Sequence, residues 1–138
     1  MSPNKQIVKA WFDAFPNLTD DVYAALIHTD FFNHASPPPL RKGPDGLKKL
    51  MAMVIAAAPD QAYICEHMVE EGDHVVTRTR WTGTLTGTYL GVKGNGKGFD
   101  VGQYHTYRIA DGKLIEHWAV RDDLAVFSQT GLTPPSPT

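Results

Sequence analysis

The segment "GKLIEHWAVRDD" (residues 112–123) alternates like a β-strand and ends in a carboxylate that could do acid/base chemistry. Leu114, Glu116, Trp118, Val120 and Asp122 fall on one face of an extended chain, because successive side chains alternate. Three of these five are apolar, so this face is expected to point into the core. An apolar wall raises the pKa of a carboxyl group toward neutrality, where it can both accept and return a proton. Asp122 is therefore either a solvated carboxylate at the end of the strand or an acid/base group in a cavity.

The preceding segment supplies polar partners for this face. Asp111–Gly112 is typical of a two-residue hairpin turn, which places Ala110 opposite Lys113. Counting outward from that pair puts Gln103, His105 and Tyr107 on the same face as Glu116, Trp118 and Asp122. A slip of one residue would exchange the two faces.

In that pocket, His105 would serve as a second catalytic group, although a hydrogen-bonded structural role is the plainer interpretation. Gln103 and Tyr107 could donate hydrogen bonds to a developing enolate oxygen, and Trp118 would form part of the wall. His117 and Arg121 are expected on the opposite, solvated face.

Metal chemistry has one weak candidate in this chain. His34 and His105 with Glu116 could form a two-histidine, one-carboxylate site if the fold brought them together. The single cysteine, Cys65, excludes a disulfide within the chain and a thiolate cluster. We expect no metal and no organic cofactor.

The elements that position these residues divide the chain into a helical and a β-rich half. Helical periodicity covers residues 3–15 with Ser2 as N-cap, a second helix follows Thr19 or Asp20, and a third begins at Pro44 and ends before Pro59. Hairpins about Gly72–Asp73 and Asp111–Gly112 follow, then a short helix ending near Gly131. This order predicts an α+β fold, a curved antiparallel sheet wrapped around the N-terminal helices to form a cone with an apolar cavity.

Bulk properties agree with a single globular domain over residues 1–138, with a frayed tail at 133–138. The chain has 138 residues, 42% of them apolar, and a formal charge of −2. This charge gives no reason to expect nucleic acid or an anionic membrane as a partner. The absence of a leader-like or membrane-spanning apolar run makes a cytoplasmic location the default expectation.

Four segments together resemble the SnoaL-like polyketide cyclase family, which has the nuclear transport factor 2-like, or ketosteroid isomerase-like, cone fold. They are "FFNHAS" (31–36), "TGTLTGTYLGVKGNGKG" (82–98), "YRIADGKLIEHWAVRDD" (107–123) and "FSQTGL" (127–132). The resemblance implies a cofactor-independent intramolecular aldol condensation that closes a ring in an apolar polyketide-like ester. It places the family's acidic acid/base residue at Asp122 and points Asn33 and His34 toward the cavity mouth as substrate-binding residues. It also implies a homodimer.

Two departures from the family pattern and two rival functions accompany the resemblance. The loop "GVKGNGKG" (91–98) has Gly-Asn in place of the usual proline pair. Leu85 stands where many relatives have histidine, which removes any mechanism that needs a histidine there. A limonene epoxide hydrolase-like hydrolase uses two carboxylates bridged by an arginine, for which Arg78 or Arg80 are the candidates. A non-catalytic protein that binds a small apolar molecule is the other alternative, because fold does not determine function.

Overall fold

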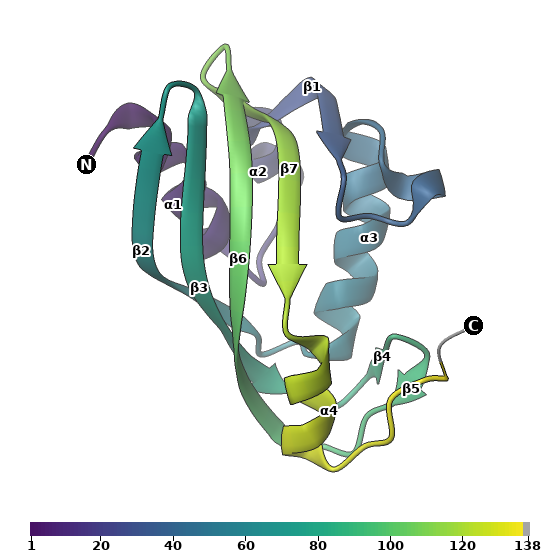
Figure 1. The fold of residues 1–138 in the computed structure, drawn as a ribbon. Helices are drawn as coiled ribbons and strands as arrows, with labels where there is room; N and C mark the ends of the chain where they lie inside the picture. Colours follow the sequence, from purple (N-terminus) through teal and green to yellow (C-terminus); the bar gives the residue numbers. More distant parts are fainter. Residues whose placement is uncertain (137–138) are drawn as a thin grey trace.

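The computed structural model describes residues 1–136, and its elements are shown in Figure 1. Helices α1 (Pro3–Ala14) and α2 (Asp20–Leu26) are followed by strand β1 (Ile27–Asn33), a 3-10 turn η1 (Pro38–Leu40) and helix α3 (Gly43–Ala57). The second half contains β2 (Ala62–Glu71), β3 (His74–Thr84), β4 (Thr88–Tyr89), β5 (Val92–Lys93), β6 (Gly98–Ala110), β7 (Lys113–Arg121) and helix α4 (Asp123–Thr130).

Side-chain caps set the ends of the helices. The Ser2 hydroxyl accepts from the backbone N–H of Lys5 at the start of α1, and the Thr19 hydroxyl accepts from that of Val22 at the start of α2. Helix α4 ends at Gly131, whose φ of 75° needs a residue without a side chain. The predicted N-caps and the glycine stop are thus confirmed.

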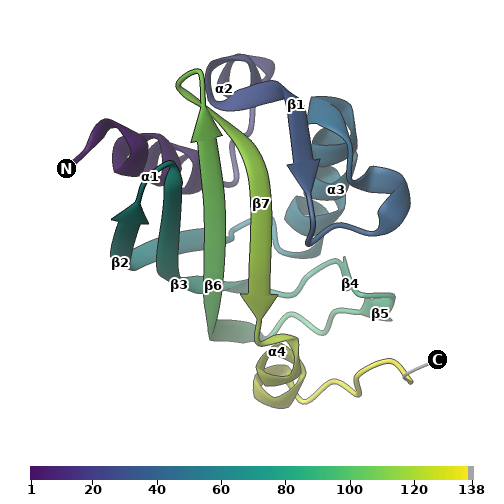
Figure 2. The ribbon, with the colours of Figure 1, turned by 45° about the horizontal axis from the view of Figure 1, so that its top comes forward.

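One five-stranded sheet, in the order β1-β7-β6-β3-β2, supports the molecule. Strands β7, β6, β3 and β2 pair antiparallel in that order, whereas β1 pairs in parallel with β7. The sheet is therefore mixed, and the prediction of a wholly antiparallel sheet is wrong. Helices α1, α2 and α3 cover one face and α4 lies across the far end of β6 and β7 (Figures 1 and 2). The predicted α+β class and curved sheet are confirmed.

A bulge in β7 changes which side chains face the helices. Near the turn, Ala110 pairs with Lys113 and Ile109 with Leu114, as predicted. The next pair is Arg108 with Glu116, so Ile115 is an extra residue in β7. Every later residue of β7 therefore points to the face opposite to the predicted one.

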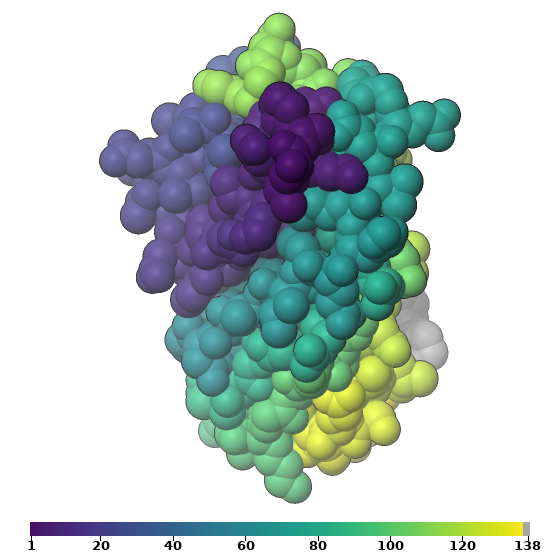
Figure 3. All heavy atoms as spheres, turned by 90° about the vertical axis from the view of Figure 1, so that its left-hand side faces the viewer, coloured from purple at the N-terminus to yellow at the C-terminus, as the bar shows by residue number. Residues whose placement is uncertain are grey.

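The core consists of two apolar clusters. The first gathers residues of α1, α2, β1 and α3 around Trp11, Phe12 and Phe31, and the second lies around Trp81, Phe99 and Phe127 at the α4 end. Tyr63 packs against both clusters. At the other end of the sheet, the N-terminal residues lie beside the β2–β3 hairpin, where Ser2 and Asn4 donate hydrogen bonds to Glu70 (Figure 3).

None of the helices within residues 1–136 is long and apolar enough to cross a bilayer. Residues 133–136 of the expected tail form no regular secondary structure, and residues 137–138 lie outside the described residues.

Candidate functional site

A narrow pocket lies between the inner face of the sheet and α3, where the two core clusters meet. Its volume is about 50 Å³. A neighbouring cavity of about 40 Å³ lies toward α1. The side chains that line both are Asn33, Met51, Tyr63, His105 and His117. Together the two hollows have room for only a few water molecules, and their polar lining makes them a narrow polar seam within an aromatic core.

A chain of four polar side chains forms the floor of this pocket. The Nδ1 atom of His117 lies 2.7 Å from the side-chain oxygen of Asn33, and its Nε2 atom lies 2.9 Å from Nδ1 of His105. Nε2 of His105 in turn lies 2.7 Å from the side-chain oxygen of Gln103. Asn33 is 2% exposed, Gln103 3%, His105 6% and His117 7%, so the chain is buried along its whole length. Buried polar groups of this kind are retained only when they are paired, as these are.

The surroundings of the two histidines favour their neutral forms. Burial lowers the pKa of His105 to about 3, and the positive charge of Arg121 lowers it further. Burial also lowers the pKa of His117 well below 6.5, assisted by His105 and by Arg121. Both imidazoles are therefore uncharged hydrogen-bonding groups at neutral pH and weak bases.

The mouth of the pocket carries the charged groups. Arg121, at the end of β7, lines the pocket and donates a hydrogen bond of 3.1 Å to the carboxylate of Asp123. Tyr89, which also lines the pocket, donates its hydroxyl to the other oxygen of Asp123. Burial, followed by the hydrogen bond to Asp123, raises the pKa of Tyr89 far above its usual value. An arginine, a neutral phenol and a carboxylate thus meet beside the seam.

The structure brings four of the predicted site residues together. Asn33, Gln103 and His105 line the pocket, and Tyr107 lines the neighbouring cavity. Burial raises the pKa of Tyr107 well above its usual value, so it is a neutral phenol. The predicted shared face of Gln103, His105 and Tyr107 is confirmed, because these three residues belong to the unbulged strand β6.

Three predicted site residues lie elsewhere. His34 follows Asn33 on the opposite side of the chain, where its ring stacks on Trp118 at 4.7 Å. Trp118 is on the outer face of the sheet, so its predicted place in the cavity wall is wrong. Asp122 is exposed and accepts a hydrogen bond from the backbone N–H of Ala125 as the N-cap of α4. The physical reason for the last two differences is the extra residue Ile115.

The outer face carries Glu116, which alternation had placed on the same face as His105. Glu116 accepts hydrogen bonds of 2.7 Å from both His34 and Arg108, and these lower its pKa below its usual value. Because His34 and Glu116 lie on the face opposite His105, the alternative metal site does not form. Within residues 1–136 no group of three or more His, Cys, Asp or Glu side chains is placed to hold a metal ion.

The arginines considered for an epoxide hydrolase also face outward. Arg78 pairs with Glu66 and Arg80 pairs with Asp100 on the exposed side of the sheet. Leu85, at the position where many relatives have histidine, is fully buried in the second core cluster. Neither observation supports an arginine-bridged carboxylate pair in the pocket.

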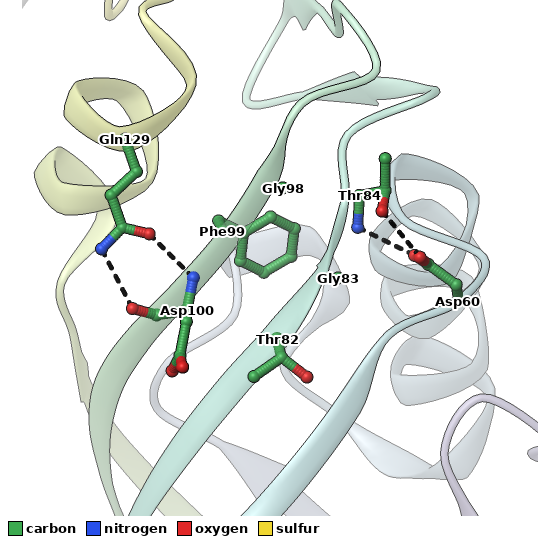
Figure 4. A pocket seen from close by; sticks show the side chains of 8 residues that line it. All are labelled: Asp60, Thr82, Gly83, Thr84, Gly98, Phe99, Asp100 and Gln129. Carbon is green, nitrogen blue, oxygen red and sulfur yellow. Dashed lines mark hydrogen bonds between the residues drawn. The ribbon is translucent and has the colours of Figure 1, made fainter.

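A larger but open hollow of about 550 Å³ lies near α4 (Figure 4). Its polar groups already satisfy one another: Asp60 accepts from the backbone N–H and the hydroxyl of Thr84, and Gln129 exchanges two hydrogen bonds with the backbone of Asp100. The hollow is therefore a structural junction between α4 and the sheet, and the enclosed seam is the better candidate for chemistry.

Sequence reasoning missed His117, Arg121 and Asp123, which are the residues that complete the site. The first two were expected on the solvated face because strict alternation was carried through Ile115. The signal that could have found them is the adjacent apolar pair Leu114–Ile115 in a strand that otherwise alternates, since two consecutive apolar residues indicate a possible bulge.

Comparisons with known proteins agree with this architecture. The sequence profile of the SnoaL-like polyketide cyclase family matches residues 5–130. The aklanonic acid methyl ester cyclase DnrD of Streptomyces peucetius is 30% identical, over 99% of this chain and 97% of that protein. DauD, the corresponding cyclase of Streptomyces sp. (strain C5), is also 30% identical, over 99% of this chain and 87% of its own length.

Solved structures show the same fold. TsrD from Streptomyces laurentii superposes with a TM-score of 0.85 at 23% identity, covering 95% of this chain and 96% of that one. A protein from Jannaschia sp. CCS1, assigned to the SnoaL-like cyclases, superposes with a TM-score of 0.81 at 28% identity, covering 96% and 94%. The chain belongs to the SnoaL-like polyketide cyclase family.

Proposed function

We propose that this protein closes a ring in an apolar, polyketide-like ester by an intramolecular aldol condensation that its own side chains catalyse. The observation that carries the proposal is the meeting of Arg121, Asp123 and Tyr89 at the mouth of a pocket whose floor is a neutral hydrogen-bonded chain. The relationship to two aklanonic acid methyl ester cyclases supports the same reaction class.

The reaction needs a base for a carbon acid and donors for the oxygen that becomes negative. A carboxylate removes the proton from a carbon between two carbonyl groups, and the enolate carbon then attacks a second carbonyl carbon of the same molecule. The new alkoxide takes the proton back from the carboxyl group, so no atom is gained or lost. Prearranged N–H donors that meet the developing charge stabilise the transition state. In this pocket the side chains of Asn33 and Arg121 supply them.

Two adjacent carboxylates at the end of β7 are candidates for the base. Asp122 is the position that matches the family, but its side chain caps α4 in solvent. Asp123 contacts Arg121 and Tyr89, both of which line the pocket. The geometry therefore favours Asp123 as the acid/base residue, with Asp122 as its matched comparison. His105, whose burial makes it a weak base, acts as an uncharged hydrogen-bonding group.

Entry of a polyketide-like ester requires the pocket to widen, because the volume of the pocket is about 50 Å³. The wall toward α3 is formed in part by Leu50, Met51 and Val54. Met51 is the most adaptable of these, since its unbranched side chain can repack without moving the backbone. Binding of a large ester is thus expected at the α3 side, with its reacting carbonyls toward Asn33.

The decisive experiment compares Asp123→Asn with Asp122→Asn. Aklanonic acid methyl ester is offered for ring closure, and methyl benzoylacetate in D₂O is followed by proton NMR for loss of its acidic C–H signal. Asp123→Asn should lower both rates by about 100-fold or more, because a general base contributes at least that much. Asp122→Asn should stay within about twofold of the wild type, since asparagine is an equally good N-cap.

The opposite result, full activity in Asp123→Asn and loss in Asp122→Asn, would assign the chemistry to the family-matched position and refute the geometric choice. Equal loss in both variants with an intact fold would mean that the end of β7 acts as a unit. Binding of the esters without exchange or ring closure in the wild type would favour the non-catalytic binding protein instead.

A homodimer, which the resemblance implies, is part of the proposal. The outer face of the sheet exposes the apolar side chains of Val76, Tyr104 and Val120, the last of which is 75% exposed. An apolar patch on a sheet face is a common subunit contact. Light scattering after size exclusion should give the mass of two chains, and Val120→Glu should give one. A single-chain mass for the wild type would refute the dimer.

A further inference from the structure

The hydrogen-bond chain on the pocket floor has a direction, and a backbone group sets it. The side-chain oxygen of Asn33 accepts from the backbone N–H of Ala35 at 3.0 Å, so this end of the Asn33 amide is the oxygen. The same oxygen lies 2.7 Å from Nδ1 of His117. An amide oxygen can only accept, so Nδ1 of His117 must carry a proton.

The remaining proton positions follow in sequence. A neutral His117 with its proton on Nδ1 has an acceptor at Nε2, and therefore Nδ1 of His105, 2.9 Å away, must donate. A neutral His105 then has an acceptor at Nε2, which needs a donor from Gln103. Turning the Gln103 carboxamide over supplies that donor, because it exchanges the oxygen and the nitrogen at the 2.7 Å contact without moving the side chain.

The alternative arrangement needs an extra charge. If the Gln103 oxygen stays at Nε2 of His105, that nitrogen and Nδ1 of His117 both carry protons, and the proton between the two rings makes either His105 or His117 an imidazolium. Burial of both rings and the nearby guanidinium of Arg121 oppose that charge. The neutral pair with the turned carboxamide is therefore the stable arrangement.

We propose that His117 is a positioning residue. The Ala35 N–H fixes the orientation of the Asn33 amide, and His117 passes the resulting order of donors and acceptors through His105 to Gln103. The pocket therefore offers an N–H donor from Asn33 and a carbonyl acceptor from Gln103. In the hydrogen bonds found within residues 1–136 the Asn33 side chain uses only its oxygen, which leaves its amide nitrogen available in a residue that lines both hollows. That nitrogen is a donor held ready for a ligand.

A donor and an acceptor on one pocket floor select a ligand with the complementary pair. The enol form of a β-dicarbonyl compound carries both a carbonyl oxygen, which accepts from Asn33, and a hydroxyl group, which donates to Gln103. The choice of this ligand class rests on the proposed function, whereas the proton positions do not, because they follow from the contacts alone.

The first test reads the proton positions directly in the ligand-free protein. Nitrogen-15 NMR of a histidine-labelled sample at neutral pH distinguishes protonated from unprotonated ring nitrogens through their couplings to the ring carbon-bound protons. Both His105 and His117 should carry a single proton, on Nδ1. A proton on Nε2 of either ring, or two protons on one ring, would overturn the proposed direction.

The second test removes the link. In His117→Asn the shorter side chain still reaches Asn33 but not His105, so Gln103 is free to present its oxygen and the proton of His105 should move to Nε2. His34→Asn, an exposed histidine on the other face, is the matched control and should leave His105 unchanged. An unmoved proton in His117→Asn would refute the positioning role. Should that variant not fold, the wild-type spectrum still decides the direction.

The third test addresses the ligand class with two small probes, acetylacetone and its 3,3-dimethyl derivative, which cannot enolise. Only acetylacetone should shift the side-chain amide signals of Asn33 and Gln103 in nitrogen-15 spectra. Equal shifts with both probes, or none with either, would refute the enol assignment. Because this binding is read without turnover, a failure of the proposed catalysis leaves a separate signature, intact binding shifts with no exchange of the C–H proton.

Discussion

Two neighbouring residue pairs, which join the end of β1 and the residue after it to β7, show how a histidine behaves on the two faces of one sheet. Asn33 pairs with His117 on the inner face, and His34 pairs with Glu116 on the outer face, each at 2.7 Å. The inner pair is buried and its histidine is uncharged. The outer pair is half-exposed and joins Arg108 in a small charge network. Burial, not residue type, keeps the inner histidine uncharged.

The difference has a consequence for where chemistry can occur. An exposed ion pair is screened by water and contributes little. A buried neutral chain fixes donors and acceptors in one direction, in an environment where a hydrogen bond to a developing charge is strong. The inner pair is therefore the part of the molecule suited to hold a reacting carbonyl group, and the outer pair is suited to hold β1 against β7.

Deletion of Ile115 should give the largest effect, because it removes the residue that keeps the two pairs on their present faces. A regular register would turn Glu116 inward and His117 outward, and burying an unpaired carboxylate costs several kcal/mol. Since domains of this size are stable by about 5 to 15 kcal/mol, we expect loss of the cooperative thermal transition in circular dichroism.

The matched control for that deletion is Ile115→Ala, which keeps the register. It removes part of a half-buried side chain and should cost about 1 to 2 kcal/mol in urea unfolding. A deletion variant that melts like Ile115→Ala would show that the bulge does not determine which pair faces the pocket.

Sequence reasoning recovered what depends on local chemistry. Ser2, Thr19 and Gly131 were identified as helix ends because capping needs those residue types, and the Asp111–Gly112 turn was found because both positions have positive φ. The faces of Gln103, His105 and Tyr107 followed from alternation in an unbulged strand. The parallel pairing of β1 with β7 was not predicted, because long-range pairing leaves no mark in either strand alone.

The assignment of β7 side chains failed for a reason of the same kind. Alternation shows only which side chains of a strand share a face, and one extra residue moves every later side chain to the opposite face. Trp118 and Asp122 were consequently expected in the pocket, which His117, Ala119 and Arg121 in fact line. Asp123 could not be found from parity, because its position depends on how α4 begins.

The pH dependence of stability should separate the inner pair from the outer pair. The folded-state pKa values of His105 and His117 are lowered from 6.5, so below pH 6.5 the unfolded chain binds protons that the folded chain does not. The free energy of unfolding should therefore fall as the pH drops from 6.5 to about 5, by up to about 1.4 kcal/mol per pH unit for each histidine. Glu116, whose lowered pKa starts from 4.5, contributes only below that window.

Urea unfolding of the wild type and of His117→Asn at pH 7, 6 and 5 measures this effect. In the wild type, His105 and His117 together produce a slope of the free energy of unfolding against pH. His117→Asn should keep about half of that slope, since one of the two buried imidazoles remains. His34→Asn should keep the full contribution from the inner pair. Identical slopes in the wild type and His117→Asn would mean that His117 takes up a proton in the folded protein.

The smallest effect is expected at the outer pair itself. Glu116→Gln removes the charge that His34 and Arg108 share, while the amide oxygen can still accept one of their hydrogen bonds. Exposed pairs contribute about 0.2 to 1 kcal/mol, so the free energy of unfolding should fall by no more than about 1 kcal/mol at low salt. Because ions screen exposed charges, most of that loss should vanish in 1 M NaCl.

Glu66→Gln is the matched control on the same face, where Glu66 pairs with Arg78 alone at a longer 3.4 Å. Its effect in urea unfolding should be close to zero at either salt concentration. A loss of more than about 2 kcal/mol in Glu116→Gln that persists in 1 M NaCl would contradict the contrast between the faces, because only a desolvated charge pair behaves in that way. The outer histidine would then be as much a part of the packed structure as His117, and burial alone would not explain the difference between the two pairs.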